Sequence, residues 1–509
     1  MSASAGVQAA IETYRREALV PSGVRSLSPA VESDWDTYEA RLWRYHHYDL
    51  YYFNTVFSQL DRYARQHLKD DDLYRYTRGI FNPVWRLVNI TAAKCYGGNL
   101  DWQTLRTGAV PLEGLDDNLT AAIRQLWKWS NWAQLKMRYA RFLARYGDGV
   151  LKVVDDPARR RVRLEVLHPG VVREADIDAV GYVKRIVIEY ERDDPEKDGE
   201  SCLYREVITQ EEFATYRVKH GEAALYPWHS DPRGNPREKW LNPYGFVPVA
   251  LAQAADVGRQ WGATTFHGGT LSKLDALNDL ASLVFDHMRQ TVDAMWYIAG
   301  ARSIEELDVQ EPEDESAERS TVQVMTGPEG SQPYPMVANI DFSGALEHIK
   351  TMLDEIRDDC PELSFADLRE FQLNSSPAVR LALGDAIDRL TEFNGNADAA
   401  LLRAFQMAIT VGGIGGYANF EPFGAGDYEA GNLDFQIKPR DIVPDELSKR
   451  EVLELWRDTE APPRWIWEAT GRSAKEIAEA EIEAFERERE VAADVARALA
   501  TGVADAEGA

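Results

Sequence analysis

The spacing of apolar residues along the first 150 positions predicts helices. Within residues 34–65, and again within 119–146, large apolar side chains recur three and four positions apart, which gathers them on one helical face. Gly147 directly follows the second run, as a glycine that ends a helix does. We therefore expect two long helices here, each with one buried face.

The pattern changes after Gly147, where short runs rich in β-branched residues predict strands. These runs lie at residues 150–154, 162–167, 182–190, 204–209 and 213–218. Asp155, Asp156 and Pro157 supply a turn between the first two runs. We expect a β-rich unit of hairpins over about 150–250, with a long loop or linker at 226–244.

Helical spacing returns in three later stretches, which are residues 271–299, 342–359 and 377–411. The first would form a rod of about 43 Å at 1.5 Å per residue. Between the first two stretches lie an acidic run and a short β-like run, at 302–319 and 321–325. The pattern predicts an α+β protein with an interrupted helical hairpin and a small domain at its tip. A strand at 433–437 and a charged helical tail at 444–500 follow.

Composition narrows the class of protein. The 509 residues carry a formal net charge of −27, so bulk electrostatics will not hold DNA, which is itself densely negative. Three cysteines without a C-x-x-C pair fit a reducing compartment. The first 20 residues are charged rather than apolar, and the longest notable uncharged stretch, 404–420, is too short to span a membrane. We expect neither a signal peptide nor a membrane anchor.

Motifs of common enzymes are missing from the sequence. Without a Gly-Lys dipeptide there is no phosphate-binding P-loop, and H-E-x-x-H, G-x-S-x-G and G-x-G-x-x-G do not occur. His46 and His47 suggest ordinary helix histidines more than a metal site, and the arginines at 159–161 suggest a charged turn or a subunit contact. Asp193, Asp194 and Glu200 suggest a solvated turn rather than a calcium loop. We expect no catalytic residue, no cofactor and no metal.

Several clusters allow two interpretations. Four carboxylates near residue 355 could be paired acids for hydrolysis or a cluster of the kind that ends many helices. The acidic run 302–319 is either a solvated loop or a docking surface for a basic partner. Trp43 and Trp132 could belong to the core or to a subunit interface, and so could the tryptophans of 452–467.

Four stretches in a fixed order resemble the portal proteins of long-tailed bacteriophages. They are ARYGDGVLKV at 144–153 with VLHP at 166–169, NPYGFVPV at 242–249, GAT at 262–264 with LSKLDALN at 271–278, and SSPAVRLAL at 375–383. Pro377 stands where that family often has glycine, so the local turn could differ. The tail at 446–490 is similar to the family's crown helices, and together these stretches span about 145–490.

The resemblance implies a portal-type α+β fold with a fixed order of parts. They are a wing at 1–266, a stem helix at 267–299, a clip at 300–341, a second stem helix at 342–360, a tunnel loop at 361–374, a wing return at 375–443 and a crown at 444–509.

The resemblance also implies a function. Family members form a ring, usually of about twelve subunits, at one capsid vertex, through which double-stranded DNA is packaged and ejected without sequence specificity. The terminase large subunit and then head–tail adaptors dock on the ring, and the major capsid protein and a scaffolding protein are further candidate partners. The implied location is the virion, with the host cytoplasm during assembly. Such a protein is a conduit and not an enzyme, which agrees with the missing P-loop.

Site residues follow from the same resemblance. Acids of the second stem helix are expected to line the channel: Asp354, Glu355, Asp358 and Asp359. The tunnel loop would place five residues near DNA: Glu362, Arg369, Glu370, Gln372 and Asn374. The clip would offer seven acids to partners: Glu305, Glu306, Asp308, Glu311, Glu313, Asp314 and Glu315. For Arg369, pairing with Glu362 or Glu370 is an equal alternative.

Two rival classes remain open at this stage. One is another structural protein of the virion, such as a head–tail connector. The other is an acidic carbohydrate hydrolase, which would need two carboxylates in an aromatic-lined cleft.

Overall fold

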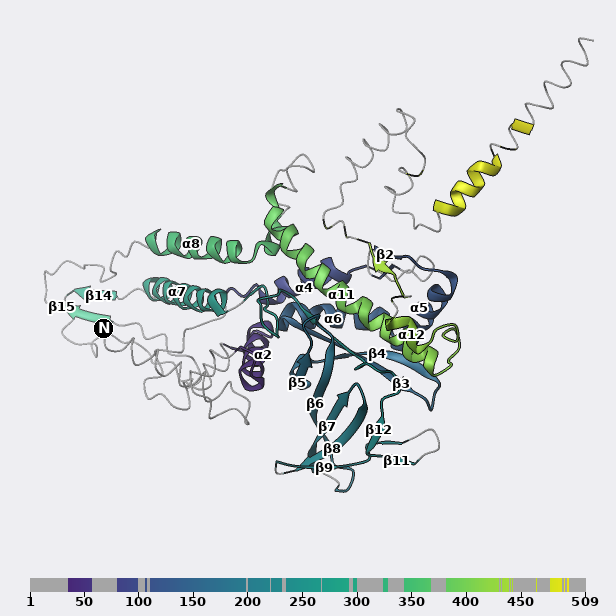
Figure 1. The fold of residues 1–509 in the computed structure, drawn as a ribbon. Helices are drawn as coiled ribbons and strands as arrows, with labels where there is room; N and C mark the ends of the chain where they lie inside the picture. The colour runs from purple at the N-terminus through teal and green to yellow at the C-terminus, as the bar shows by residue number, and fades with distance from the viewer. Residues whose placement is uncertain are drawn as a thin grey trace, which may run out of the picture. The chain divides into compact units, whose positions relative to one another are not determined.

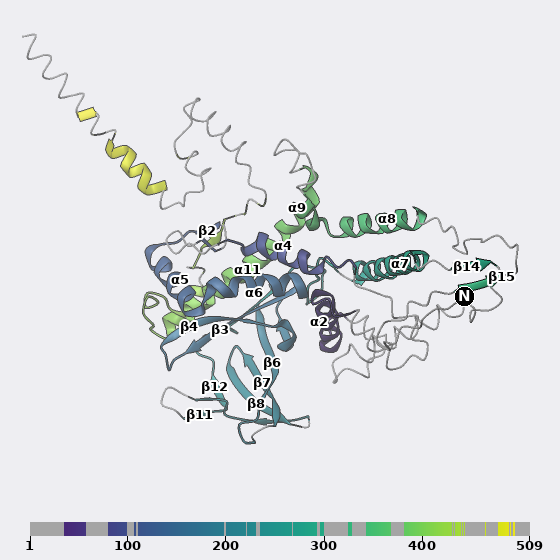
Figure 2. The ribbon, with the colours of Figure 1, turned by 180° about the vertical axis from the view of Figure 1, so that it is seen from behind.

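The computed structural model shows an α+β protein (Figures 1 and 2). It describes residues 35–56, 80–98, 106–107, 110–197, 200–219, 221–230, 235–266, 268–292, 296–299, 324–327, 343–367, 381–429 and short pieces between 431 and 493, which are 431, 433–438, 440, 442, 464, 477–487, 489 and 492–493. The chain divides into two compact units. The first comprises 1–26, 46–85 and 266–361, and the second comprises 27–45, 86–265 and 362–509.

The second unit contains a three-stranded antiparallel sheet in the order β13-β3-β4. Its strands are β13 (Val249–Gln253), β3 (Asp148–Asp156) and β4 (Arg161–Leu167). The first two predicted strands are confirmed as β3 and β4, with the turn at Pro157 between them. Strand β13 was not predicted, because its run of five residues is too short to show a period.

A second antiparallel sheet in this unit has the order β12-β8-β7-β6-β5, with β9 beside β8. Its strands are β5 (Val172–Ile177), β6 (Val183–Asp193), β7 (Ser201–Thr209), β8 (Glu212–Lys219), β9 (Glu222–Leu225) and β12 (Lys239–Leu241). The predicted hairpins are confirmed. The predicted loop at 226–244 is wrong in part, since β12 pairs with β8 and β10 (His229–Ser230) pairs with β11 (Pro236–Arg237).

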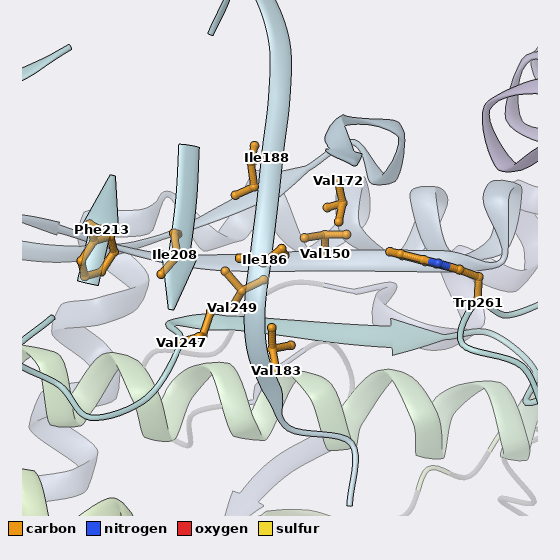
Figure 3. Close-up of a cluster of buried hydrophobic side chains, with 10 residues drawn as sticks. All are labelled: Val150, Val172, Val183, Ile186, Ile188, Ile208, Phe213, Val247, Val249 and Trp261. Atoms are coloured by element: carbon orange, nitrogen blue, oxygen red, sulfur yellow. The ribbon is translucent and has the colours of Figure 1, made fainter. Parts of the chain in front are cut away.

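The two sheets share one apolar core (Figure 3). Val150 and Val249 from the small sheet meet Ile186, Ile188 and Ile208 from the large one. All five are almost fully buried, and burial of such a side chain contributes on the order of 1.5–3 kcal/mol. The pairing of these faces fixes how the β-rich part of the unit is assembled.

The opposite face of the small sheet is covered by helices (Figure 1). They are α5 (Asp117–Ser130), α6 (Trp132–Tyr146) and α11 (Gly384–Ile414). Trp132 is fully buried and its ring meets that of Phe405 edge-on, which settles its role as core within this unit. The predicted single helix at 119–146 is wrong, because Asn131 adopts a left-handed conformation with φ 49° and separates α5 from α6.

Several further helices and strands lie outside these two sheets and outside the α7–α8 region. They are α2 (Tyr38–Tyr52), α4 (Val84–Tyr96), α9 (Ser364–Asp367), α12 (Ala425–Glu429), two 3₁₀ turns at Pro169–Val171 and Pro361–Leu363, and a small sheet of β1 (Arg106–Thr107), β2 (Val110–Glu113) and β16 (Gln436–Ile437). Only β16 represents the strand predicted at 433–437. Helix α11 overlaps the helix predicted at 377–411, although residues 377–380 lie outside the described part of the chain.

In the first unit, α7 (Gly268–Val292) leads to β14 (Trp296–Ala299), which pairs in parallel with β15 (Val324–Gly327), and α8 (Ser343–Asp359) follows. The prediction of helix 342–359 is confirmed. The helix predicted at 271–299 is too long, because the chain leaves the helix after Val292 and Trp296 starts a strand. A β-branched and aromatic run such as 296–298 suits either state, and pairing with β15 decides for the strand.

Asp148 is a buried carboxylate at the start of β3 that joins distant parts of the second unit. One oxygen accepts a hydrogen bond from the Tyr45 hydroxyl at 2.5 Å, and the other accepts one from the Gly262 backbone N–H at 2.8 Å. Burial raises the pKa of Asp148 to about 6, although both hydrogen bonds and Arg41 act in the opposite direction. The charge is therefore held in place at a cost in free energy.

Gly147 permits this arrangement. Its φ of 82° ends α6, as the sequence predicts, and a Cβ atom there would lie 2.7 Å from the carbonyl carbon of Ala263. The Gly147 carbonyl oxygen in turn accepts the N–H of Ala254 at 2.7 Å. Two backbone segments can thus approach only because no side chain stands between them.

We expect Asp148→Asn to weaken the dependence of stability on pH. The folded-state pKa of about 6 lies above the usual value of 3.8, so wild type gains stability as pH falls through 6. Between pH 7 and pH 5 this gain is on the order of 1 kcal/mol, and an amide cannot contribute it. Urea unfolding of both proteins at the two pH values measures the difference, and an identical pH dependence would contradict a titrating, buried Asp148.

Candidate functional site

Helices α7 and α8 lie side by side and antiparallel, and they carry the described part of the predicted stem (Figures 1 and 2). Lys273, near the start of α7, reaches Glu355 at 3.7 Å and Asp359 at 2.9 Å, both near the end of α8. The Thr270 hydroxyl also lies 3.3 Å from Asp359. These contacts fix the relative level of the two helices.

The sequence explains where these helices form and which face each buries. Leu271, Leu274 and Leu277 on α7 recur at helical spacing and are buried. Helix α8 ends at Asp359, two residues before Pro361, which has no N–H to continue the helical hydrogen bonds. Ile356 is buried in α8, whereas most other residues of this helix keep substantial exposure. Much of α8 is therefore available to other molecules.

Asn278 fixes α7 to the chain segment before α4. This fully buried side chain accepts hydrogen bonds from the backbone N–H groups of Ile80 and Phe81, at 2.8 and 2.9 Å. Its amide group donates to the carbonyl oxygens of Phe81 and Leu274. A single side chain thus satisfies three backbone groups of a neighbouring segment and one of its own helix.

The four acids predicted to line a channel do not share one surface. Asp354 and Asp358 are exposed on the side of α8 opposite Ile356. Glu347, about two helical turns before Asp354, lies on the same side. Glu355 and Asp359 instead flank Lys273 between the helices. Asp354 also makes an exposed ion pair with Arg357 at 3.4 Å, of a kind that contributes little to stability.

Lys273 is held in its charged form. Its hydrogen bond to Asp359 raises the pKa of the ammonium group, and the charges of Asp359 and Glu355 act in the same direction.

The exposed side of α8 opposite Ile356 carries three acids, which are Glu347, Asp354 and Asp358. We use the name acidic stripe for these three residues below.

Glu362 corrects the predicted tunnel-loop set. Its side chain is buried rather than exposed to DNA, and it lies 3.5 Å from the Arg389 guanidinium of α11. Burial raises the pKa of this carboxyl, which the charge of Arg389 opposes. Among the described residues Glu362 pairs with Arg389, and the predicted alternative pairing with Arg369 lies outside them.

Other predicted site residues lie outside the described residues. These are the remaining tunnel-loop residues Arg369, Glu370, Gln372 and Asn374, and the clip acids Glu305, Glu306, Asp308, Glu311, Glu313, Asp314 and Glu315. Their assignment stays a prediction. The tail tryptophans of 452–467 also lie outside the described part of the chain.

The charged turn predicted at 159–161 is present. Arg161 and Arg163 approach Asp156 at 3.4 Å each, and Arg160 donates to the Gly416 carbonyl oxygen at 3.0 Å. These arginines therefore find their partners within the second unit, which agrees with the interpretation as a charged turn.

The solvated turn predicted around Asp194 is wrong in one respect. The Asp194 side chain is buried and pairs with Lys219 and Arg217, and these partners lower its pKa. Two cations on β8 hold the end of β6 in this way, which the spacing in sequence could not show.

A cavity of about 410 Å³ opens between the two sheets of the second unit. Phe213 and Trp240 stack within its lining at an interplanar angle of 4°. Three carboxylates also line it, which are Asp155, Asp156 and Glu206. Glu206 pairs with Lys152 at 2.5 Å, and Asp155 accepts hydrogen bonds from the hydroxyls of Tyr244 and Tyr417.

Asp155 and Glu206 differ in their electrostatic environment. Burial raises the pKa of Asp155 despite its two tyrosine hydrogen bonds. Burial acts on Glu206 in the same direction, but the adjacent Lys152 ammonium outweighs it and lowers the pKa. Asp155 and Glu206 both have partners within the protein. These contacts account for the two acids as members of a structural polar network.

Polar residues inside the fold are the main feature that sequence reasoning missed. Asp148 and Asn278 stand within the quoted motifs, yet the motifs alone did not indicate that each ties separate segments together. Their signal was a polar residue within an otherwise apolar, periodic run, as in the leucine-rich stretch around Asn278. Within the described residues we find no group of three or more potential metal ligands and no helix long and apolar enough to cross a bilayer.

We expect Asn278→Ala to loosen the attachment of Ile80 and Phe81 to α7. The substitution leaves two N–H groups without their acceptor, at a cost on the order of 2 kcal/mol. Hydrogen–deuterium exchange of the segment around residue 80 should become faster. Ser282→Ala, which removes one hydroxyl from the same helix, serves as the control and should change exchange much less. Unaltered exchange in the Asn278 variant would contradict the clamp.

Comparisons with known proteins find similar chains among the solved structures. No protein-family model matches the sequence, and no curated protein matches it. A solved structure titled "Virion of native gene transfer agent (GTA) particle" contains a chain similar to this one, with 16% sequence identity and a TM-score of 0.37. The similarity covers 78% of this chain and 90% of that chain.

Proposed function

We propose that this chain is a phage-type portal protein. Copies of it form a ring at a capsid vertex, double-stranded DNA passes through the ring, and a terminase and then head–tail adaptors dock on it. The proposal rests on the order of the sequence motifs together with one structural observation, the α7–α8 hairpin and its outward acidic stripe.

The hairpin supports a conduit because of its shape and connections. Helix α7 of 25 residues extends about 37 Å at 1.5 Å per residue, and α8 returns beside it. The chain between them includes the parallel pair β14 and β15. The two helices are antiparallel, and their connection contains a small strand pair. This arrangement agrees with the stem and clip that the portal resemblance implies. The rival classes do not require it.

The acidic stripe supports passage of DNA rather than binding. Asp354 and Asp358 are exposed on the side of α8 opposite Ile356, so their charge is presented to the surroundings of the hairpin. About twelve copies would present a ring of carboxylates, and the field of such a ring repels phosphate over about 8 Å at physiological salt. A channel used in both directions has to avoid tight phosphate contacts.

We expect the double variant Asp354→Lys/Asp358→Lys to assemble normally but to slow DNA transit several-fold at low salt. Each new lysine can bind phosphate, and that attraction weakens as salt rises, so transit should recover with salt. The measurement is the rate of packaging or ejection. Glu211→Lys/Glu222→Lys makes the same change of charge at exposed sites on the β-rich part and should leave transit unaltered. Equal transit in wild type and the α8 variant would refute the assignment of the stripe.

A second candidate function, carbohydrate hydrolysis, is favoured by the cavity with Asp155 and Glu206. It combines stacked aromatics with two carboxylates whose pKa values shift in opposite directions, a pattern found in glycoside hydrolases. Our proposal expects no turnover of oligosaccharides by the purified chain. Hydrolysis that disappears in both Asp155→Asn and Glu206→Gln would favour this second function instead.

A further inference from the structure

Helix α7 exposes an apolar ridge on a side that does not face α8. Leu283 is 56% exposed there, and half-buried Leu280, which lies two helical turns after Lys273, continues the ridge toward α8. Asp279 is exposed beside Leu283, on the flank of this ridge that lies away from α8. The exposed Leu283 at the outer edge of this ridge offers an apolar contact to another molecule.

Helix α8 has a ridge of the same kind with the opposite charge beside it. Leu346 is 52% exposed and Leu353, two turns later, is half-buried. Lys350 is exposed next to Leu346 and separates this ridge from Asp354 on the acidic stripe. The two ridges are therefore complementary, because each combines leucines with a charge that the other lacks.

The ridges lie on opposite sides of the hairpin. Lys273 marks the side of α7 that faces α8, and Glu355 and Asp359 mark the side of α8 that faces α7. With 3.6 residues per turn in both helices and antiparallel directions, Leu283 then points to one side of the plane that contains both axes, and Leu346 points to the other. One chain cannot bring its two ridges into contact.

The ridges are also at the same level along the hairpin. Lys273 lies level with residues 355–359, and each step forward on α7 corresponds to one step back on α8. Leu283 is therefore level with Leu346, and Asp279 is level with Lys350, to within about one residue or 1.5 Å. Rotation about a ring axis parallel to the helices preserves this level.

We infer that the α7 ridge of one copy packs against the α8 ridge of the next copy around a ring. This inference rests on the proposed function and adds the surface through which the hairpins associate. The contact is heterologous, since different surfaces of the two copies meet, and repetition of such a contact closes a ring. The leucines supply apolar contact, and Asp279 with Lys350 sets register and partner choice.

This contact leaves the acidic stripe uncovered. Lys350 stands between Leu346 and Asp354 on the α8 surface, so the neighbouring α7 covers one flank of Lys350 and the stripe remains on the other. Assembly and DNA passage thus use different faces of the same helix, which lets experiments test them separately.

A charge exchange tests the contact in the full-length protein. Asp279→Lys and Lys350→Glu should each reduce the fraction of ring at a given concentration, as measured by sedimentation velocity and native mass. The double variant Asp279→Lys/Lys350→Glu should regain most of it, because the opposite charges face each other again. Asp358→Lys is the matched control on α8 and should leave assembly unaltered. Independent effects of the two substitutions, without recovery, would overturn the inference.

Cross-linking gives a second test that does not depend on charge. Leu283→Cys and Leu346→Cys lie at exposed positions, so both variants should fold, while the native Cys95, Cys202 and Cys360 are buried. Oxidation of the double variant should yield a ladder of covalent oligomers, and a mixture of the two single variants should yield dimers only. Oxidation within one chain, or no cross-link in an assembled ring, would overturn the inference and leave the portal proposal standing. Wild type that stays monomeric at all concentrations and with scaffold would contradict both.

Discussion

The close approach of backbone at Gly147 and Asp148 is the constraint on which the second unit depends. Helix α6 ends there, β3 begins there, and the segment around Gly262 passes against both. A buried carboxylate is costly, yet Asp148 satisfies a tyrosine hydroxyl and a backbone N–H that would otherwise be buried without partners. The charge therefore determines a unique arrangement of three segments that are more than 100 residues apart along the chain.

A similar principle organises the hairpin of the first unit. Asn278 accepts hydrogen bonds from two backbone N–H groups of a neighbouring segment, and Lys273 pairs with two acids near the C-terminal end of α8. Lys273 near the start of α7 pairs with α8, whereas Asn278 near the middle of α7 holds the segment around residue 80. Most of α8 is left exposed, and this exposed surface is the part of the hairpin on which the proposed function depends.

The distribution of charge separates three roles along α8. Glu355 and Asp359 turn inward to Lys273, Lys350 flanks an apolar ridge, and Asp354 and Asp358 face outward. Spacing along a helix is enough to place these groups on different faces, so one helix can pair with its own partner and still carry the surfaces that our proposals assign to a neighbouring copy and to DNA. Glu362, immediately after the helix, is buried against Arg389 and takes no part in this surface.

Local spacing alone predicts the fold class and several elements with a clear period, although it does not show where a long periodic run is broken. The hairpins of the β-rich unit, α8, the end of α6 at Gly147 and the α+β class all follow from local spacing, because a buried face imposes a period of 2 or 3.6 residues. Shorter or interrupted elements were not predicted. Strand β13 has only five residues, and the break at Asn131 needs only one left-handed residue. Which acids stand together was decided by tertiary structure alone. Glu355 and Asp359 differ from Asp354 and Asp358 only in what lies beside them, and the neighbour that distinguishes them, Lys273, is about 80 residues away along the chain.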